Sequence, residues 1–236
     1  MKKLFCTFVV TLTFLLNFSA NALETKSYIP ENPTRALIFI HGYGGSGERM
    51  TWLKDRLKPL FPDTAFYFPT APDKAPHGGY EWFVIPELGE GMSREDIYQE
   101  MMKDALRNTA PLHKLIKEIR QNLNISYQDI DIAGFSQGGL MALLSALTFD
   151  DNLGKVISLS GVPLVFTSDF TKSQVKTAPS ILLIQGNRDN IIPKDSLDLT
   201  KQTLNALKIT PVVREIPNMS HTISSEALQE LQTFLK

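Results

Sequence analysis

A serine flanked by glycines follows one of the apolar runs of the chain. Ser136 stands in the segment Gly-Phe-Ser-Gln-Gly-Gly (134–139), directly after the run 130–133 and before a helical pattern. A strand that turns sharply into a helix strains its middle residue, tolerates only small neighbours and pushes the side chain out above the sheet. A glycine-rich turn with a helix-capping serine is the alternative. The position between strand and helix favours Ser136 as a nucleophile.

Two further polar side chains fit the partners that such a serine needs. A serine hydroxyl requires a base, and the base requires an orienting carboxylate, in the chain order Ser, Asp or Glu, His. His221 is the only histidine after Ser136. Asp189 follows the apolar run 181–184, so we expect it to be the carboxylate. Asp195 and Asp169 are the alternatives to Asp189 as the carboxylate. Asp195 stands where a helix is expected to begin, and Asp169 directly follows no predicted strand.

The oxyanion of an acyl-transfer intermediate needs two backbone N–H groups aimed at one point. One is the amide of Gln137, after the nucleophile, and the other should come from a loop after an earlier strand. The segment Ile-His-Gly-Tyr-Gly-Gly-Ser-Gly (40–47) is that loop, with the Tyr43 amide as the expected donor. A plain glycine-rich connector is the alternative. A dinucleotide fingerprint fits poorly, because its spacing and its acidic residue are lacking.

Alternating strands and helices must position these residues. Short apolar runs are typical of strands buried on both faces, and six occur: 35–40, 65–68, 130–133, 155–159, 181–185 and 212–216. Helical patterns cover 52–60, 96–122, 140–147, 196–207 and 224–235, and Pro111 divides or kinks the second of them. The alternation predicts a mostly parallel central sheet with helices on both faces, and chemistry at the carboxyl ends of its strands.

The first 22 residues have the layout of a secretory signal peptide. A basic start (Met1-Lys2-Lys3) precedes an apolar stretch, and small residues stand before a cleavage point after Ala22. The alternative, a membrane anchor, requires about 20 apolar residues, and this run is shorter. We expect an exported protein, periplasmic or secreted, with a single domain at 23–236 and no stable membrane anchor. Cys6 is the only cysteine and would leave with the signal.

Composition excludes several classes of protein. The chain of 236 residues is 43% hydrophobic, with 24 Lys and Arg against 25 Asp and Glu. These values are typical of a globular protein and exclude a disordered chain or a polytopic membrane protein. The balanced charge argues against nucleic acid as the main partner, because binding to phosphates needs a surplus of basic residues. The oligomeric state stays open.

The motifs together resemble the phospholipase/carboxylesterase family of α/β-hydrolases, which includes acyl-protein thioesterases. The segment 134–139 matches the family's nucleophile motif residue for residue, and His41-Gly42 resembles its Leu-His-Gly loop. Further matches are Pro69 to Pro72, Trp82-Phe83, Gly186 to Pro193 and Ser220-His221. The resemblance spans 35–236 and implies an α/β-hydrolase fold with Ser136, Asp189 and His221 as a triad and no metal or organic cofactor.

The departures from the family pattern lie beside the substrate. Tyr43 stands where the family usually has Leu, Gly45 where it has Asp, and Val84 where it has Asp. The segment 69–94 has little periodicity and is long for a connection, as lids and binding loops often are. Its aromatic residues are Tyr80, Trp82 and Phe83. They are candidates for lining an acyl pocket, and packing in the core is the alternative. His77 and His113 are expected to face solvent.

The sequence therefore predicts a serine hydrolase that cleaves small-molecule or lipid esters through an acyl-enzyme. The substrates that we expect first are esters of short to medium acyl chains, followed by lysophospholipids or other lipid esters. An acyl thioesterase, or a peptidase or amidase, with the same triad is an alternative, as is a catalytically dead binding module that keeps the fold.

Overall fold

The apolar runs form a seven-stranded sheet. The computed structural model describes residues 22–86, 92–193 and 195–236, so the expected signal peptide lies almost wholly outside the described residues. The strands follow the order β1-β3-β2-β6-β7-β8-β9 across the sheet. Their bounds are β1 Thr25–Tyr28, β2 Arg35–Ile40, β3 Thr64–Pro69, β6 Ile130–Phe135, β7 Lys155–Leu159, β8 Ser180–Gly186 and β9 Val212–Ile216.

Six of these strands coincide with the predicted runs, and all six run parallel. Strand β1 was not predicted and pairs antiparallel with β3 at the edge of the sheet. Its residues, Thr-Lys-Ser-Tyr, are exposed or half-buried, because an edge strand has solvent on one side. The predicted mostly parallel α/β-hydrolase sheet is confirmed.

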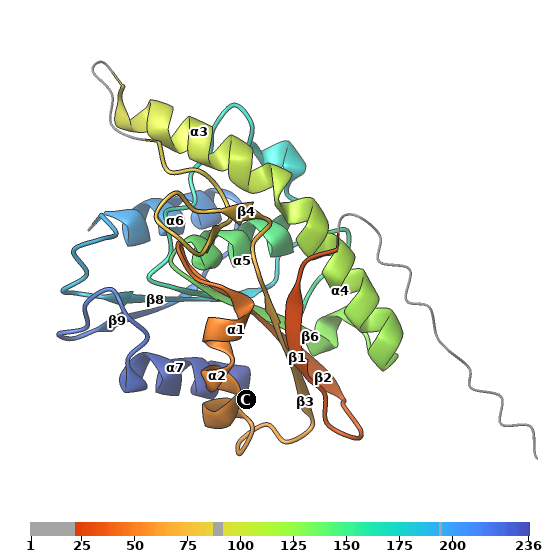
Figure 1. The fold of residues 1–236 in the computed structure, drawn as a ribbon. Helices are drawn as coiled ribbons and strands as arrows, with labels where there is room; N and C mark the ends of the chain where they lie inside the picture. The colour runs from red at the N-terminus through yellow and green to blue at the C-terminus, as the bar shows by residue number, and fades with distance from the viewer. Residues whose placement is uncertain (1–21, 87–91, 194) are drawn as a thin grey trace, which may run out of the picture.

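Helices cover both faces of the sheet (Figure 1). One face carries α1 Gly47–Met50, α2 Trp52–Leu57 and α7 Ser225–Leu235, and the other carries α3 Arg94–Arg107, α4 Thr109–Leu123, α5 Gln137–Thr148 and α6 Ser196–Ala206. Successive residues of β2 point to opposite faces of the sheet. Leu37 and Phe39 pack on the face covered by α1, α2 and α7, and Ile38 and Ile40 pack on the face covered by α3 to α6.

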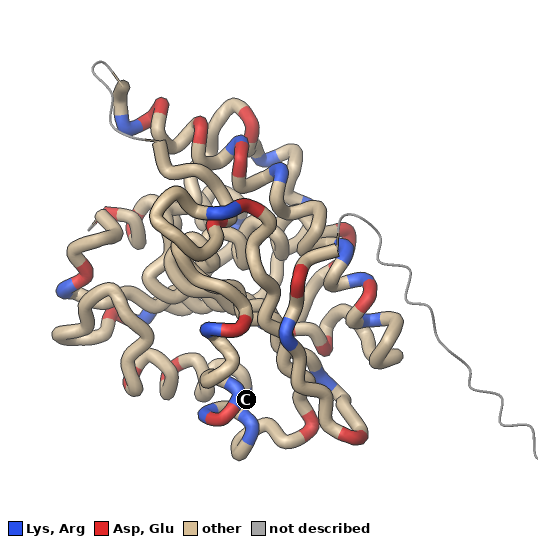
Figure 2. The backbone as a smooth tube through the Cα atoms, in the orientation of Figure 1, with Lys and Arg blue, Asp and Glu red and all other residues tan. Residues whose placement is uncertain are grey.

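The predicted break near Pro111 occurs slightly earlier in the chain. Helix α3 ends at Arg107 and α4 begins at Thr109, which places Pro111 in the first turn of α4. An amide at that position has no partner inside the helix, so proline costs no hydrogen bond there. Both acidic and basic residues occur along each of these two helices (Figure 2). None of the helices in the described part of the chain is long and apolar enough to cross a membrane.

The segment 69–94 contains a short hairpin, β4 Asp73–Lys74 with β5 Tyr80–Glu81. The hairpin packs beside the loop after β2, since Gly45 forms an isolated bridge with Tyr80. The carboxyl ends of β2, β6, β8 and β9 lie along one edge of the sheet and lead into the loops that carry the predicted site residues.

Candidate active site

Ser136 occupies a strained turn between β6 and α5. Its backbone angles are φ 56° and ψ −119°, and a positive φ is rare for a residue with a side chain. Its amide donates to the carbonyl of Leu159 on the neighbouring strand at 2.9 Å. Its carbonyl accepts from the Gly139 amide at 2.9 Å. The turn is therefore held at both ends, with the Ser136 side chain at the top of the sheet.

The glycines of the motif are required by close backbone contacts. A Cβ on Gly134 would lie 2.0 Å from the carbonyl oxygen of Gly138, and one on Gly138 would lie 2.2 Å from that of Ile40. Both contacts are with backbone, so no side-chain rotation could relieve them. The tight packing brings the end of β6, the start of α5 and the end of β2 together under the serine.

Asp189 and His221 form a hydrogen-bonded pair. The Nδ1 atom of His221 lies 2.8 Å from Oδ2 of Asp189, which also accepts from Nε2 of Gln185 at 3.1 Å. The amides of Ile191 and Ile192 donate to Oδ1, each at 3.0 Å. Burial alone would raise the pKa of Asp189, but the hydrogen bonds from His221 and the two amides hold it below its ordinary value.

The loops after β8 and β9 are fastened to each other. The Arg188 amide donates to the carbonyl of Met219 at 3.0 Å, and the Asn218 amide donates to Oδ1 of Asn187 at 2.7 Å. A Cβ on Gly186 would lie 2.2 Å from the Met219 carbonyl oxygen, so only glycine permits this approach. These contacts set the position of His221 relative to Asp189.

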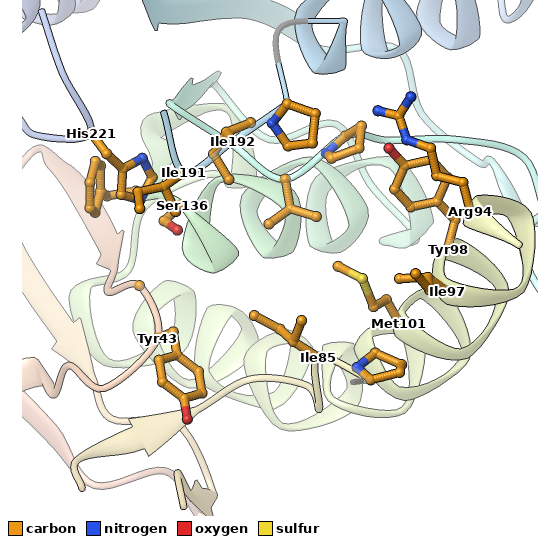
Figure 3. A pocket seen from close by; sticks show the side chains of 16 residues that line it. Tyr43, Ile85, Arg94, Ile97, Tyr98, Met101, Ser136, Ile191, Ile192 and His221 are labelled. Atoms are coloured by element: carbon orange, nitrogen blue, oxygen red, sulfur yellow. The ribbon is translucent and has the colours of Figure 1, made fainter. Parts of the chain in front are cut away.

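The imidazole of His221 lies next to the turn that carries the serine. Its ring packs on the ring of Phe135, the residue before Ser136, with centroids 4.7 Å apart. Ser136 and His221 line the same cavity and stand at the same end of it (Figure 3). Because Nδ1 faces the carboxylate, Nε2 is the nitrogen left to take a proton.

The loop after β2 also reaches the serine. A Cβ on Gly42 would lie only 3.0 Å from Cβ of Ser136. The residue after Gly42 is Tyr43. Within the described segments, its amide donates to no backbone oxygen. The Gln137 amide is the first of α5 and has no acceptor within the helix. Two amides without a backbone acceptor thus belong to the two segments that meet at Ser136.

His41 anchors this loop from below. It is fully buried, its Nδ1 lies 2.7 Å from the carbonyl oxygen of Gly42, and its Nε2 accepts from the Ala71 amide at 3.0 Å. This arrangement requires a neutral ring that carries its proton on Nδ1. Burial lowers the pKa of His41 to about 4, which keeps the ring neutral at physiological pH. The indole of Trp82 donates to the His41 carbonyl at 3.0 Å.

A cavity of about 820 Å³ opens at Ser136. Apart from the serine, the histidine and the polar residues Tyr43, Arg94 and Tyr98, its lining is glycine or apolar. The apolar members are Ile85, Pro86, Ile97, Met101, Phe135, Val162, Pro163, Ile191, Ile192 and Pro193. Within the described segments, no three His, Cys, Asp or Glu side chains gather as a metal site would need.

Comparison with known proteins identifies the family of the chain. The family described as Phospholipase/Carboxylesterase matches residues 27–236. The chain belongs to the phospholipase/carboxylesterase family. A probable carboxylesterase, SOBER1-like, of Arabidopsis thaliana is 30% identical over 85% of this chain and 77% of its own length. Acyl-protein thioesterase 1 of Debaryomyces hansenii is 29% identical over 85% of this chain and 89% of its own length.

Two solved structures share the fold of this chain. Esterase PE8 superposes with a TM-score of 0.79 at 24% identity, covering 91% of this chain and 98% of its own. Acyl-protein thioesterase 2 of Zea mays gives a TM-score of 0.70 at 19% identity, covering 90% and 97%. The predicted family membership is confirmed, and the protein is a hydrolase that acts on carboxylic esters.

The aromatic residues expected at the acyl pocket lie elsewhere. Trp82 and Phe83 are fully buried in the core, and Tyr80 lines a separate hollow beside the hairpin. The side-chain amide of Gln137 fixes this segment, since its Oε1 accepts from the Trp82 amide at 3.0 Å and its Nε2 donates to the Phe83 carbonyl at 2.7 Å. The aromatic side chains therefore support the loops around the serine, and other residues line the cavity.

Several site residues were missed from the sequence. Gln185, which hydrogen-bonds Asp189, is the last residue but one of β8, and nothing in its residue type marks it as part of a site. The cavity wall on α3 is formed by Ile97 and Met101, which fall within the predicted helical pattern 96–122 but were not predicted to line a pocket. His113 is half-buried and not solvent-facing as expected, because its Nε2 lies 2.9 Å from the Ser145 carbonyl oxygen. His77 is exposed, as predicted.

Proposed function

We propose that the protein hydrolyses esters through an acyl-enzyme on Ser136. The serine oxygen attacks the ester carbonyl carbon while His221 Nε2 accepts its proton. The tetrahedral intermediate then expels the alcohol, which leaves with that proton. In the second half of the reaction, His221 accepts a proton from a water molecule, which attacks the acyl-enzyme carbonyl. The proton then returns to the Ser136 oxygen as the acid is released. Asp189 holds the imidazole and stabilises its charged form.

The observation that carries this proposal is the pairing of a strained serine with an oriented imidazole at one end of one cavity. The 2.8 Å contact between His221 and Asp189 supports the tautomer that a base needs. The amides of Tyr43 and Gln137 support the role of oxyanion donors, because both stand beside Ser136. Preorganised donors of this kind are worth about 3 kcal/mol each in the transition state.

The cavity supports acyl chains as the preferred acid part of the substrate. Its lining is mostly hydrophobic, and its volume of about 820 Å³ leaves room for a short to medium chain. Lysophospholipids and other lipid esters are the next class. A thioesterase activity is a second candidate, because relatives at 27–29% identity carry the name acyl-protein thioesterase 1.

An ester panel tests the proposal. The purified protein should hydrolyse p-nitrophenyl esters from acetate to dodecanoate and lose this activity after treatment with a fluorophosphonate. A matched pair of an oxygen ester and a thioester with the same acyl chain separates the two candidates by kcat/KM. Absence of turnover on every ester and thioester, with cleavage of peptide substrates, would contradict the proposal.

We further propose that the protein is exported after cleavage behind Ala22. The basic start, the apolar stretch and the small residues before the cleavage point support this. The test is N-terminal sequencing of protein from a bacterial host that is separated into cytoplasm, periplasm and medium. A chain that begins at Leu23 outside the cytoplasm is expected, and an intact Met1 in the cytoplasm would contradict export.

A further inference from the structure

The catalytic cavity extends along one face of α3, away from the serine. Four residues of this helix line it at the spacing of one helix face: Arg94, Ile97, Tyr98 and Met101. With a rise of 1.5 Å per residue, this face covers about 10 Å from Arg94 to Met101. Figure 3 shows Ser136 at one end of the cavity and Arg94 and Tyr98 at the other. An acyl chain that lies along the cavity from Ser136 therefore points toward Arg94.

A bidentate ion pair holds Arg94 at this distal end. The guanidinium donates to both carboxylate oxygens of Asp195, at 2.7 and 2.6 Å. Its central carbon lies 5.5 Å from the centre of the Tyr98 ring. The hydrogen bond from Arg94 holds the pKa of Asp195 below its ordinary value, so both partners are charged at neutral pH. Paired in this way, the guanidinium is held in one place although it lies at the surface.

The same ion pair connects two walls of the cavity. Asp195 follows the loop after β8, whose residues Ile191 to Pro193 line the cavity. Arg94 is the first residue of α3, which lines it from another side. The pair thus joins two segments that are 101 positions apart in the chain, at the end of the cavity that lies away from Ser136.

We propose that the ion pair of Arg94 and Asp195 is the end wall of the acyl site and sets the longest acyl chain that the enzyme accepts. This inference rests on the proposed esterase function and names the chain length of its substrates. The side chains of Arg94 and Asp195 are 47% and 49% exposed, so water solvates both charges. A methylene chain that extended over them would remove this water without replacing its hydrogen bonds, which is unfavourable.

The test measures kcat/KM for p-nitrophenyl esters from butyrate to hexadecanoate. In the wild type, kcat/KM should rise with chain length to a maximum and then fall. Asp195→Ala removes the partner that holds Arg94 and should raise the ratio of kcat/KM for hexadecanoate to that for octanoate by about 4- to 10-fold, since one more buried methylene is worth about fourfold. The Asp195 side chain makes no capping hydrogen bond to α6, so this variant removes no helix cap.

An exchange of the two charges separates the ion pair from the size of its side chains. Arg94→Asp should raise the same ratio, because two carboxylates then face each other. Combining Arg94→Asp with Asp195→Arg restores an ion pair and should return the ratio to within about twofold of the wild type. A double variant that accepts hexadecanoate as well as the single variants do would overturn the proposal, because side-chain size would then set the limit.

Arg214→Ala is the matched control. Arg214 forms an ion pair of similar exposure with Glu230, at 2.8 Å, and neither residue is among those that line the cavity. This variant should leave the ratio unchanged. Because every variant is measured on the same esters under the same conditions, micelle formation by the longer esters affects all of them equally.

Two further outcomes would overturn the proposal while leaving the esterase function intact. One is an unchanged ratio in Asp195→Ala, and the other is a wild type whose kcat/KM still rises at hexadecanoate. Absence of turnover on every ester by the wild type would instead overturn the esterase function.

Discussion

The imidazole Nδ1 of His221 and the carboxylate Oδ2 of Asp189 lie 2.8 Å apart, although 32 positions separate the two residues in the chain. Three more donors hold the same carboxylate, from Gln185, Ile191 and Ile192. The carboxylate is thus fixed before it orients the imidazole. This rigidity is what a base needs to stay in one tautomer through many turnovers.

Replacing Asp189 by Asn should lower kcat by about 10⁴-fold, because the amide permits the wrong imidazole tautomer. Steady-state kinetics on a p-nitrophenyl ester measures the effect. Asp169→Asn is the control, since Asp169 was a rival for the same role and interacts with Gln99 instead. A loss below tenfold in Asp189→Asn, or equal losses in both variants, would count against the assignment.

The turn around Ser136 should tolerate no side chain at position 134. Gly134→Ala would place a Cβ 2.0 Å from the Gly138 carbonyl oxygen and should destabilise the fold by several kcal/mol. Gly78→Ala should cost only about 1 kcal/mol, because Gly78 has a positive φ but open space around it. Urea unfolding compares the two variants, and similar losses would show that crowding at position 134 is not decisive.

His41 should make the fold less stable as the pH falls. Its folded pKa of about 4 lies below the ordinary value of 6.5, so the unfolded chain binds more protons between these values. Stability is therefore full above pH 6.5 and falls toward pH 4, by roughly 3 kcal/mol for a shift of this size. Burial lowers the pKa of His113 as well, which adds to the same trend.

Proton NMR can separate the two histidines. The His41 Cε1 proton should show no titration above pH 5, and its signal is assigned by its loss in His41→Gln. Urea unfolding at several pH values from 7 to 4.5 gives the matching fall in stability. A His41 signal that titrates near pH 6.5, or stability that is constant over this range, would contradict the neutral buried ring.

The cavity wall should set the acyl chain length. Met101 is buried and lines the cavity on α3, so Met101→Trp should shorten the space available to the chain. We expect kcat/KM for decanoate to fall at least tenfold while that for butyrate stays within about threefold. Met101→Leu, which conserves volume, is the control. Parallel losses on both esters in Met101→Trp would place the acyl chain elsewhere.

The central sheet could be predicted because its strands are buried on both faces and therefore read as unbroken apolar runs. Strand β1 could not, since its Lys26 and Ser27 face solvent at the sheet edge. The two-residue strands β4 and β5 are too short to leave a periodic signal. Local sequence thus predicts the interior of this sheet better than its border.

The chemistry of the site could be predicted for a related reason. Ser136, Asp189 and His221 each follow a recognisable strand, and parallel strands bring their carboxyl ends to one edge. The cavity could not be predicted, because its walls come from α3 and from loops whose packing no local pattern specifies. Trp82 illustrates this, since an aromatic side chain suited to a pocket is buried instead with its indole on the His41 carbonyl.

The most direct test of the central claim is the site of covalent labelling by a fluorophosphonate, read by mass spectrometry of the digested protein. The label should be found on Ser136, and Ser136→Ala should lose both the label and ester turnover. Ser160→Ala is the matched control, because Ser160 is also a buried serine with positive φ after a parallel strand, yet does not line the cavity. A label on another residue, or substantial ester turnover by Ser136→Ala, would contradict the account.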